Sequence, residues 1–556
     1  MATAAQDNPA APPPAPPPAP VAADLAEPYL SRHLSSLGLA VEYVRAEGNT
    51  LYHLDADGAE IPVLDLAGGF GSTILGHNHP GIVSCARDLL DRQAPVFAQF
   101  SLHSYAHTVA ERLNAILRRE SGDDEPYMAV FANSGAEAIE VAVKHAELDR
   151  VLKLSEMTRT IQDNVETVRS AVCRGAAGIP DDAWHRLRVR PPASGVAADA
   201  AEALVTAVRA HNTEVAQSPP LLLALEGSFH GKLVGSVQLT HNAAFRAPFR
   251  ALGVQSRFVP TGRPDVLDGI IAAERRSLFG LAVHDRRVHL TEHPMPRFCA
   301  FVLEPVQGEG GIRVLDEEFT RRIRRACAEA GCPVVVDEIQ SGMGRTGSFF
   351  ASSAIGLRGD YYVLGKSLGG GLTKAAVTLV RGSLYRPQFE MAHSSTFAKD
   401  GFSTLVAART LDLLEAGGGR AYRQAEERGE RLTAALDTVR RDFPDVVRDV
   451  RGMGLMIGLE LHDLSDSPCS AIREHARAGT LGYAAAGYLL QAHSVRIFPT
   501  ASAPATLRFE PSIHLTDSEI GHAGAALRAL CGVLREHDRE RLLARPARPA
   551  GKGKEH

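Results

Sequence analysis

Residues 334–347, VVVDEIQSGMGRTG, join an apolar run to two consecutive acids. The β-branched valines favour a strand that is buried on both faces of a sheet. Asp337 and Glu338 stand at the end of this run, where an ionised carboxylate removed from water is costly unless a cation or hydrogen-bond donors meet it. The stretch therefore predicts a buried strand whose carboxyl end faces a positively charged group.

Similar apolar runs recur along the chain and alternate with amphipathic helical patterns. The runs are MAVFANS (128–134), LLLALEGS (221–228), CAFVLEPV (299–306) and YYVLGKS (361–367). Strands separated by helices favour an α/β fold with a mainly parallel sheet that is covered on both faces. Ligands of such folds bind where the carboxyl ends of the strands meet the following loops.

The composition is that of an ordinary soluble protein with at least two domains or one large bilobed unit. The 556 residues carry a formal charge of -5, which gives no basic field to hold nucleic acid or an anionic membrane. No apolar run reaches the roughly 18 residues that a membrane helix needs. Seven cysteines without a CxxC spacing are typical of reduced core residues. We expect a cytoplasmic protein with no nucleic-acid partner and no membrane partner.

Three segments differ from the α/β pattern. Residues 1–24 are rich in Ala and Pro and predict a disordered tail, and residues 538–556 predict a basic tail. Residues 148–218 are mostly polar and helix-like, and they predict an inserted helical element because so long a connection needs structure of its own. We hypothesise that this insertion caps the mouth of a site and selects the substrate.

Lys366 follows the apolar run YYVLG and comes 29 residues after Asp337. Taken alone, a lysine at this position is most simply interpreted as a residue whose ammonium group reaches the surface. Burial would instead favour the neutral amine that Schiff-base chemistry requires. A carboxylate and an amine at two strand ends could form a salt bridge or could flank a third group. A pyridine ring suits the second case, so the pair predicts a site for pyridoxal 5′-phosphate (PLP).

The phosphate of such a cofactor needs an anion site. FANSGAEAIEVAVK (131–144) predicts a turn of small residues that opens a helix, where free amides and the helix dipole attract an anion. Ser134 and Glu137 alone would predict only a capping box, which forms without a ligand. Beside Lys366 and Asp337, the anion site is the better interpretation.

Nine motifs, in order and spacing, resemble those of the class III (ornithine/ω-type) aminotransferases, which are PLP enzymes of fold type I. They are DLAGGFGSTILGHNHP, FANSGAEA, EGSFHGK, EPVQGEGG, VVVDEIQSGMGRTG, LGKSLGGGL, HSSTF, RGMGLMIGLEL and LRFEPS. The resemblance covers roughly residues 30–535. It implies a large domain with a mainly parallel seven-stranded sheet between helices, and a small α+β domain. The implied parts are 25–95 (N-terminal segment of the small domain), 96–400 (PLP-binding large domain, including the insertion) and 401–537 (C-terminal small domain).

The resemblance implies how the cofactor ring is held. Lys366 would form the Schiff base with PLP, and Asp337 would bind the pyridinium nitrogen. Gln340 would contact the phenolic oxygen of the ring. Phe229 would stack on one face of the ring and Ile339 would pack on the other.

The resemblance also implies how the phosphate is held and how the protein assembles. Ser134, Gly135 and Ala136 would bind the phosphate, joined by Thr396 from a second subunit. His230 would support the ring contacts as a hydrogen-bond partner rather than as a catalyst. These roles imply a homodimer with shared sites.

Substrate recognition is implied at three positions. Glu309 and Arg508 match a switch in which the arginine binds a substrate carboxylate and returns to the glutamate when the substrate lacks one. We therefore expect an amino acid or keto acid, such as glutamate or 2-oxoglutarate, among the substrates; a purely structural ion pair is the alternative. Phe70 would suit an apolar substrate, or would be an ordinary core residue. Glu510 departs from the family, because an apolar residue is more usual there.

The histidine-rich turn GHNHP does not predict a metal site. His77 and His79 have no third ligand beside them, and the family uses this turn structurally. We therefore predict PLP as the cofactor and no metal.

These observations predict a PLP-dependent aminotransferase. It would move an amino group from an amino-acid or amine donor to an aldehyde or keto-acid acceptor by ping-pong kinetics. We also hypothesise that this reaction belongs to specialised-metabolite biosynthesis. The alternatives are an aminomutase, racemase or decarboxylase on the same cofactor, and a non-catalytic scaffold that docks to a carrier protein.

Overall fold

The computed structural model describes residues 26–98, 101–102 and 104–543. The tail predicted at residues 1–24 lies outside the described residues, as does most of the tail predicted at 538–556. Residues 538–543 of that second tail are described, and they include the short helix α17 (Arg539–Leu542). Within the described residues, no helix combines the length and the apolar character needed to cross a membrane.

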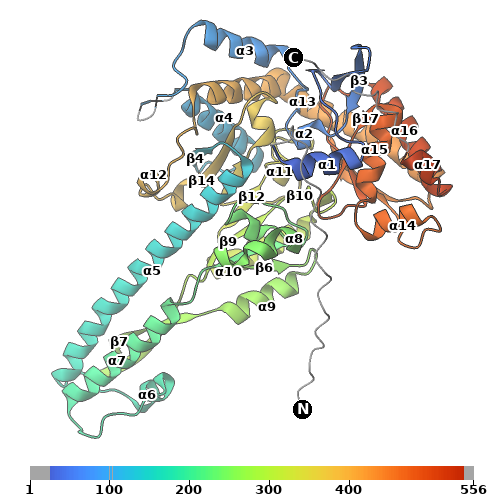
Figure 1. Ribbon diagram of the computed structural model, residues 1–556. Coiled ribbons are helices and arrows are strands. Elements are labelled where there is room, and N and C mark those ends of the chain that lie inside the picture. Colours follow the sequence, from blue (N-terminus) through green and yellow to red (C-terminus); the bar gives the residue numbers. More distant parts are fainter. Residues whose placement is uncertain (1–25, 99–100, 103, 544–556) are drawn as a thin grey trace.

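A seven-stranded sheet forms the centre of the molecule (Figure 1). Its strands, in spatial order, are β4 (Tyr127–Ala132), β14 (Ala376–Arg381), β13 (Tyr361–Leu364), β12 (Val334–Asp337), β9 (Phe298–Leu303), β5 (Leu221–Leu225) and β6 (Gln255–Val259). Only β14 runs against its neighbours, and the other pairings are parallel. The predicted α/β class with a mainly parallel sheet is confirmed.

The valine run is buried on both faces because successive side chains of a strand point to opposite sides. Val335 lies in a cluster with Ala138 of helix α5 (Gly135–Cys173), whereas Val334 and Val336 lie in a second cluster with Ile323 of helix α10 (Glu317–Ala330). All of these valines are at most 1% exposed. This two-sided burial explains why the strand is continuously apolar up to its carboxyl end.

The remaining strands form smaller sheets beside the central one. One sheet has the order β1 (Arg45–Glu47), β2 (Thr50–Leu54), β3 (Glu60–Asp65) and β17 (Val495–Arg496), so it joins the two ends of the chain. Another has the order β15 (Val447–Met453), β16 (Met456–Leu461), β19 (Thr506–Phe509) and β18 (Phe498–Pro499). The short pair β10 (Val306–Gln307) and β11 (Arg313–Val314) follows β9.

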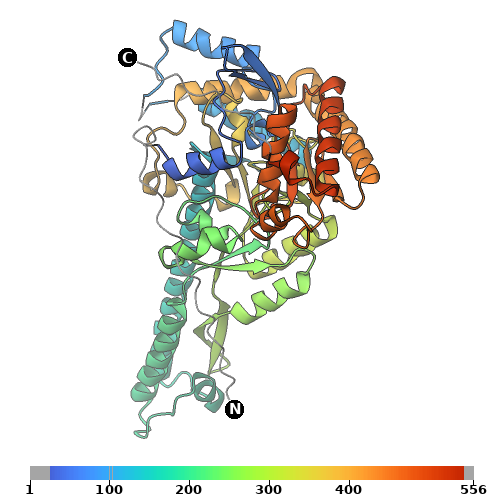
Figure 2. The ribbon, with the colours of Figure 1, turned by 45° about the vertical axis from the view of Figure 1, so that its right-hand side comes forward.

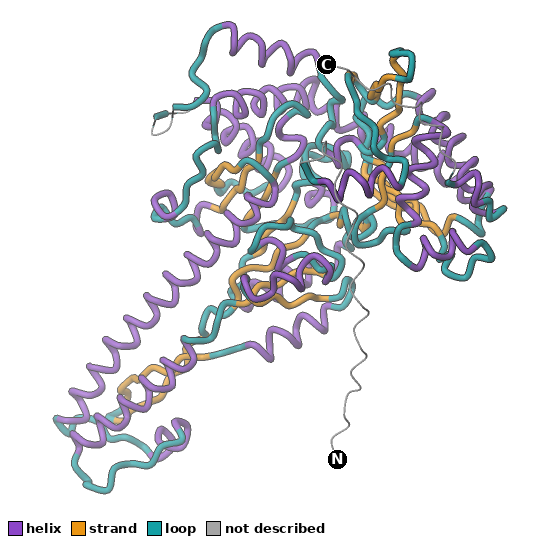
Figure 3. Tube along the Cα trace, viewed as in Figure 1, coloured by secondary structure: helices purple, strands orange, loops and turns teal. Residues whose placement is uncertain are grey.

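Helices surround these sheets (Figure 3). The α-helices of the body are α1 (Pro28–Ser36), α2 (Gly68–Gly71), α3 (Pro80–Asp91), α4 (Ser104–Ser121), α8 (Ala243–Arg246), α9 (Pro264–Glu274), α10 (Glu317–Ala330), α11 (Ala351–Ala354), α12 (Phe389–Ala392), α13 (Gly401–Asp442, interrupted at 416–419), α14 (Ser470–Arg477), α15 (Leu481–His493) and α16 (Asp517–Arg535). The 3-10 helices are η1 (Ser236–Leu239), η2 (Ala247–Leu252), η3 (Lys366–Gly369) and η4 (Gly382–Leu384).

A long arm projects from the body in both Figure 1 and Figure 2. We define the arm as residues 148–173 of α5 (Gly135–Cys173), helices α6 (Asp181–Leu187) and α7 (Ala197–Ala216), and the antiparallel hairpin of β7 (Ser277–His284) and β8 (Arg287–Pro294). The segment 148–218 is mostly helical, but its first part, residues 148–173, continues α5 without a break. The hairpin, about 60 residues farther along the sequence, was not foreseen as part of the insertion.

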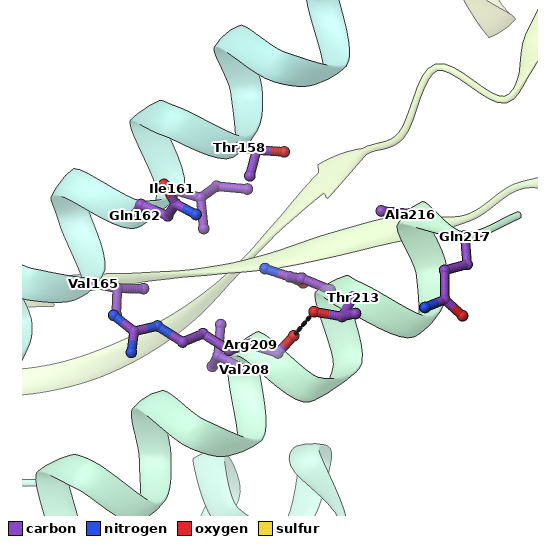
Figure 4. A pocket seen from close by; sticks show the side chains of 10 residues that line it. Thr158, Ile161, Gln162, Val165, Val208, Arg209, Thr213, Ala216 and Gln217 are labelled. Atoms are coloured by element: carbon purple, nitrogen blue, oxygen red, sulfur yellow. Dashed lines mark hydrogen bonds between the residues drawn. The ribbon is translucent and has the colours of Figure 1, made fainter. Parts of the chain in front are cut away.

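The arm has an apolar core of its own. Ile161 and Val165 of α5, Leu204 and Val208 of α7 and Leu281 of β7 belong to one buried cluster, separate from the clusters that cover the central sheet. A hollow of about 440 Å³ lies between α5 and α7 at this level. Figure 4 shows the side chains that line it. Its charged side chain, Arg209, pairs with Glu166 at 2.8 Å, so the hollow offers no unpaired charge for a ligand.

Glu338 ties the end of β12 to the following loop. Its side chain is fully buried and accepts hydrogen bonds from Ser341 Oγ at 2.6 Å and from the Ser352 amide at 2.7 Å. Burial raises the pKa of Glu338 to about 7, although both serines oppose the rise. The second acid of the opening motif is therefore a core residue that binds a proton more tightly in the folded protein.

This burial predicts a pH dependence that Glu338→Gln removes. The folded carboxyl keeps its proton up to a pKa of about 7, whereas the unfolded one releases it near 4.5, so its contribution to stability is complete below pH 4.5 and is lost as the pH rises to 7. We expect the wild type to lose about 3 kcal/mol relative to E338Q between pH 4.5 and 8. Urea unfolding of both proteins across this range measures the difference, and parallel curves would contradict the assignment.

Because the arm has a separate core, we predict that the arm can be destabilised while the body stays intact. Leu204→Ala should cost about 2–5 kcal/mol, because it leaves a cavity in the arm cluster. Hydrogen exchange should then accelerate within 148–218 and within the β7–β8 hairpin, while β12 and β13 keep their protection. Leu223→Ala in β5 is the control that should loosen the central sheet. Equal loss of protection in arm and sheet for L204A would show that the two are one cooperative unit.

Candidate functional site

The carboxyl ends of β12 and β13 bring Asp337 and Lys366 to one place. These strands are parallel, with Asp337 paired to Val363, and Lys366 follows three residues later. Both residues line a cavity of about 330 Å³ at this edge of the sheet. The other lining residues are Gly135, Ala136, Phe229, His230, Gly231, Lys232, Glu304, Val306, Ile339, Gln340 and Ser341. Eight of the thirteen predicted site residues are thus among the residues of a single cavity.

Asp337 is buried and its two oxygens have separate partners. Oδ2 lies 2.7 Å from His230 Nδ1, and Oδ1 accepts a hydrogen bond from the Ile339 amide at 3.0 Å. Burial alone would lower the pKa of His230, but the hydrogen bond and the charge of Asp337 outweigh it, so that pKa is raised. The positive group that the opening motif requires is therefore supplied in part by His230.

Glu304 is the neighbour of this pair that the sequence interpretation left without a role. Its carboxylate accepts hydrogen bonds from the Phe229 amide at 3.0 Å and from the Gly308 amide at 3.1 Å. Burial raises the pKa of Glu304, and Asp337 adds to the rise. The sequence did contain a signal for Glu304: it is an acid at the end of the apolar run CAFVLE, just as Asp337 is an acid at the end of its own strand.

Lys366 lies in a strained backbone position inside the site. Its φ is 45°, in the left-handed region that non-glycine residues rarely adopt, and such strain is common at functional positions. Burial lowers the pKa of Lys366, although the charge of Glu510 opposes this effect. The side chain is thus biased toward the neutral amine.

The turn before α5 closes one side of the cavity. Ser134 caps the helix and forms the predicted capping box with Glu137. Gly135 is required by close approach, because a Cβ there would lie 2.8 Å from Ile339. Gly231 has φ 114°, and a Cβ on it would lie 2.6 Å from the Cβ of Ala136. Gly135 and Ala136, which begin this long helix, line the cavity, so the free amides of a helix N-terminus lie at its edge.

The predicted substrate residues form a second group next to the cavity. Arg508 is 2% exposed and forms an ion pair with Glu309, whose other oxygen accepts a hydrogen bond from the Ala501 amide at 2.7 Å. The guanidinium carbon lies 4.9 Å from the centre of the Phe70 ring. Phe70 is 42% exposed, so the core alternative does not apply to it.

Three other residues lie away from the cavity. Thr396 is exposed and is not among the residues that line it. His79 caps α3 by accepting a hydrogen bond from the Gly81 amide, and His77 lies 2.8 Å from the carboxylate of Asp65. The arm contributes no side chain to the described cavity lining and leads away from it, which does not support a cap over this chain's own site (Figure 2).

The chemistry of this cavity fits PLP. A carboxylate and an amine stand on two adjacent strand ends, an aromatic side chain and Ile339 line the space with them, and a helix N-terminus supplies amides for an anion. These residues therefore include a suitable partner for each part of PLP: the ring nitrogen, the aldehyde, the two ring faces and the phosphate.

Solved structures share this fold. An ornithine aminotransferase from Toxoplasma gondii ME49 is 19% identical, with a TM-score of 0.61 over 93% of this chain and 93% of that one. An amine transaminase from an uncultivated Pseudomonas species, in its PLP-bound form, is 20% identical, with a TM-score of 0.61 over 88% of this chain and 94% of that one.

The family model described as Aminotransferase class-III matches residues 34–520. The match spans most of the chain, including the arm, both strand ends and the Arg508 group. This chain therefore belongs to the class III aminotransferase family, whose members are PLP-dependent transaminases.

Proposed function

We propose that the enzyme moves an amino group from an amino-acid or amine donor to an aldehyde or keto-acid acceptor in two half-reactions, by ping-pong kinetics. The observation that carries this proposal is the placement of the Lys366 amine and the Asp337 carboxylate on one cavity. An internal salt bridge, the alternative use of such a pair, is not among the ion pairs of the described residues, where Asp337 pairs with His230.

Several residues would hold the cofactor. Asp337, which pairs with His230, would bind the pyridinium nitrogen, and Gln340 would contact the phenolic oxygen. Phe229 and Ile339 would pack on the two ring faces. When bound, PLP supplies an electron sink for the pair released at the substrate carbon.

The phosphate would lie at the start of α5. The amides of Gly135 and Ala136, with the hydroxyl of Ser134, would meet it, and the helix dipole favours its charge. Thr396 lies outside this chain's own cavity lining, which supports a role in the site of a second copy. The proposal therefore includes a homodimer.

Lys366 would carry the proton. Its Nζ would take the proton from the carbon that bears the substrate's amino group and return it to C4′ of the cofactor. A base must be neutral to do this, and the burial that lowers the pKa of Lys366 favours that state.

Glu309, Arg508 and Phe70 would contact the part of the substrate that does not react. Their grouping supports the Glu–Arg switch, with Phe70 as an apolar wall. The hypothesis of a role in specialised-metabolite biosynthesis rests on the arm alone. An aminomutase, racemase or decarboxylase would use the same cavity, so the outcome of the half-reaction separates these chemistries.

The first test asks whether Lys366 bonds the cofactor. After incubation with PLP and reduction with borohydride, mass analysis should find one pyridoxyl group on the peptide that contains Lys366. Lys366→Ala should lack the adduct and should lose activity by at least about 100-fold, because proton transfer loses its base. Wild-type protein without an adduct would favour the scaffold alternative.

The second test asks which reaction follows. An amino donor added without any acceptor should convert the bound cofactor stoichiometrically to pyridoxamine phosphate, with release of the matching carbonyl compound. A panel of amino acids and amines, followed by a panel of aldehydes and keto acids, identifies donor and acceptor. A racemised donor, or release of carbon dioxide without pyridoxamine phosphate, would instead assign one of the other chemistries.

A further inference from the structure

Glu510 is a fully buried carboxylate beside the Arg508 group. Its Oε2 accepts a hydrogen bond from Gln340 Nε2 at 3.0 Å and lies 3.5 Å from Arg508 Nε. Its Oε1 has no hydrogen-bond partner within the described part of the chain. A buried carboxylate with an unused oxygen is costly, so cations nearby must stabilise its charge.

The guanidinium group of Arg508 contacts two carboxylates and one aromatic ring. One terminal nitrogen pairs with Glu309, Nε faces Glu510, and the guanidinium stacks on Phe70. Two carboxylates thus share one arginine. Arg345 and Lys366 also lie near enough to feel the charge of Glu510, but among the described residues its ion pair is with Arg508.

The carboxylates of Glu309 and Glu510 differ in how firmly the protein holds them beside Arg508. The Glu309 side chain is 14% exposed, and apart from Arg508 its carboxylate is held by the Ala501 amide. Glu510 has no exposed surface, its own amide donates to the Leu66 carbonyl at 2.8 Å, and Gln340 binds its side chain. When Glu309 moves away from Arg508, Glu510 therefore remains.

Glu510 also fixes the amide of Gln340. A carboxylate only accepts hydrogen bonds, so the nitrogen of that amide must face Glu510. The amide oxygen lies against Gly308, where an added Cβ would be 1.7 Å away. Glu510 is thus joined to the predicted ring contact as well as to the substrate arginine.

We propose that Glu510 determines substrate specificity, by keeping a fixed negative charge on Arg508 that disfavours substrates with a distal carboxylate and favours those with an uncharged or amine-bearing end. This inference rests on the proposed function, because it places Arg508 at the substrate. Like charges brought together in a buried site repel strongly, and the repulsion persists whichever way Glu309 turns.

The test uses two ligands that differ only in the distal carboxylate. 2-Oxoglutarate and 2-oxopentanoate are added to PLP-loaded enzyme, which has no amino group to give, and calorimetry measures binding without turnover. For the wild type we expect 2-oxopentanoate to bind at least as tightly as 2-oxoglutarate. In Glu510→Gln, which keeps an acceptor for Gln340, 2-oxoglutarate should bind at least about tenfold more tightly, while binding of 2-oxopentanoate changes little.

Three further variants separate charge from structure. Glu510→Asp keeps the charge and should keep the wild-type preference. Glu510→Leu removes the charge by another route and replaces E510Q if that variant does not fold. Glu338→Gln removes a different fully buried carboxyl that does not contact Arg508, and it should leave the preference unchanged.

The outcomes distinguish this inference from the proposed function. Visible absorbance of bound PLP is measured for every variant before binding. If the wild type takes up no PLP, the proposed function is wrong. If the wild type is loaded and the charge-removing variants bind 2-oxoglutarate no more tightly than it does, or if E338Q has the same effect as E510Q, the role of Glu510 is overturned.

Discussion

The arrangement of the site depends on the cost of burying charge at two neighbouring strand ends. The valine run drives β12 into a core that excludes water, and the same burial places Asp337 where its charge must be compensated. His230 and the Ile339 amide meet this need on one side. On the other side, Lys366 is biased toward a neutral amine. The chemistry thus follows from where the strands end.

The sequence was sufficient for the parts of the fold that depend on local pattern. The continuous apolar runs became β5, β9, β12 and β13, because strands buried on both faces cannot alternate apolar with polar residues. The run at 128–134 became the edge strand β4, which is only partly buried. Asp337 and Lys366 were recognisable for the same reason, since an acid and an amine directly after such runs have few alternatives to a shared site.

Other features could not be read from the sequence because they depend on contacts between distant segments. Five of the eight residues of β8 are polar, and only the packing of the β7–β8 hairpin on the helices of the insertion makes it part of the arm. Glu338 stands next to Asp337 at the end of the same run, but it faces the core instead of the cavity. The contact of Arg508 with Phe70 joins positions 438 residues apart, and no local pattern announces it.

The continuity of α5 has a mechanical consequence. One rod of backbone hydrogen bonds begins at the proposed phosphate site and runs unbroken to the far tip, since residues 136–173 contain neither proline nor glycine. The part beyond the body is roughly 39 Å long at 1.5 Å per residue, so a swing of about 5° where it emerges displaces the tip by roughly 3 Å. The arm is therefore a rigid extension of the helix whose first residues, Gly135 and Ala136, line the cavity.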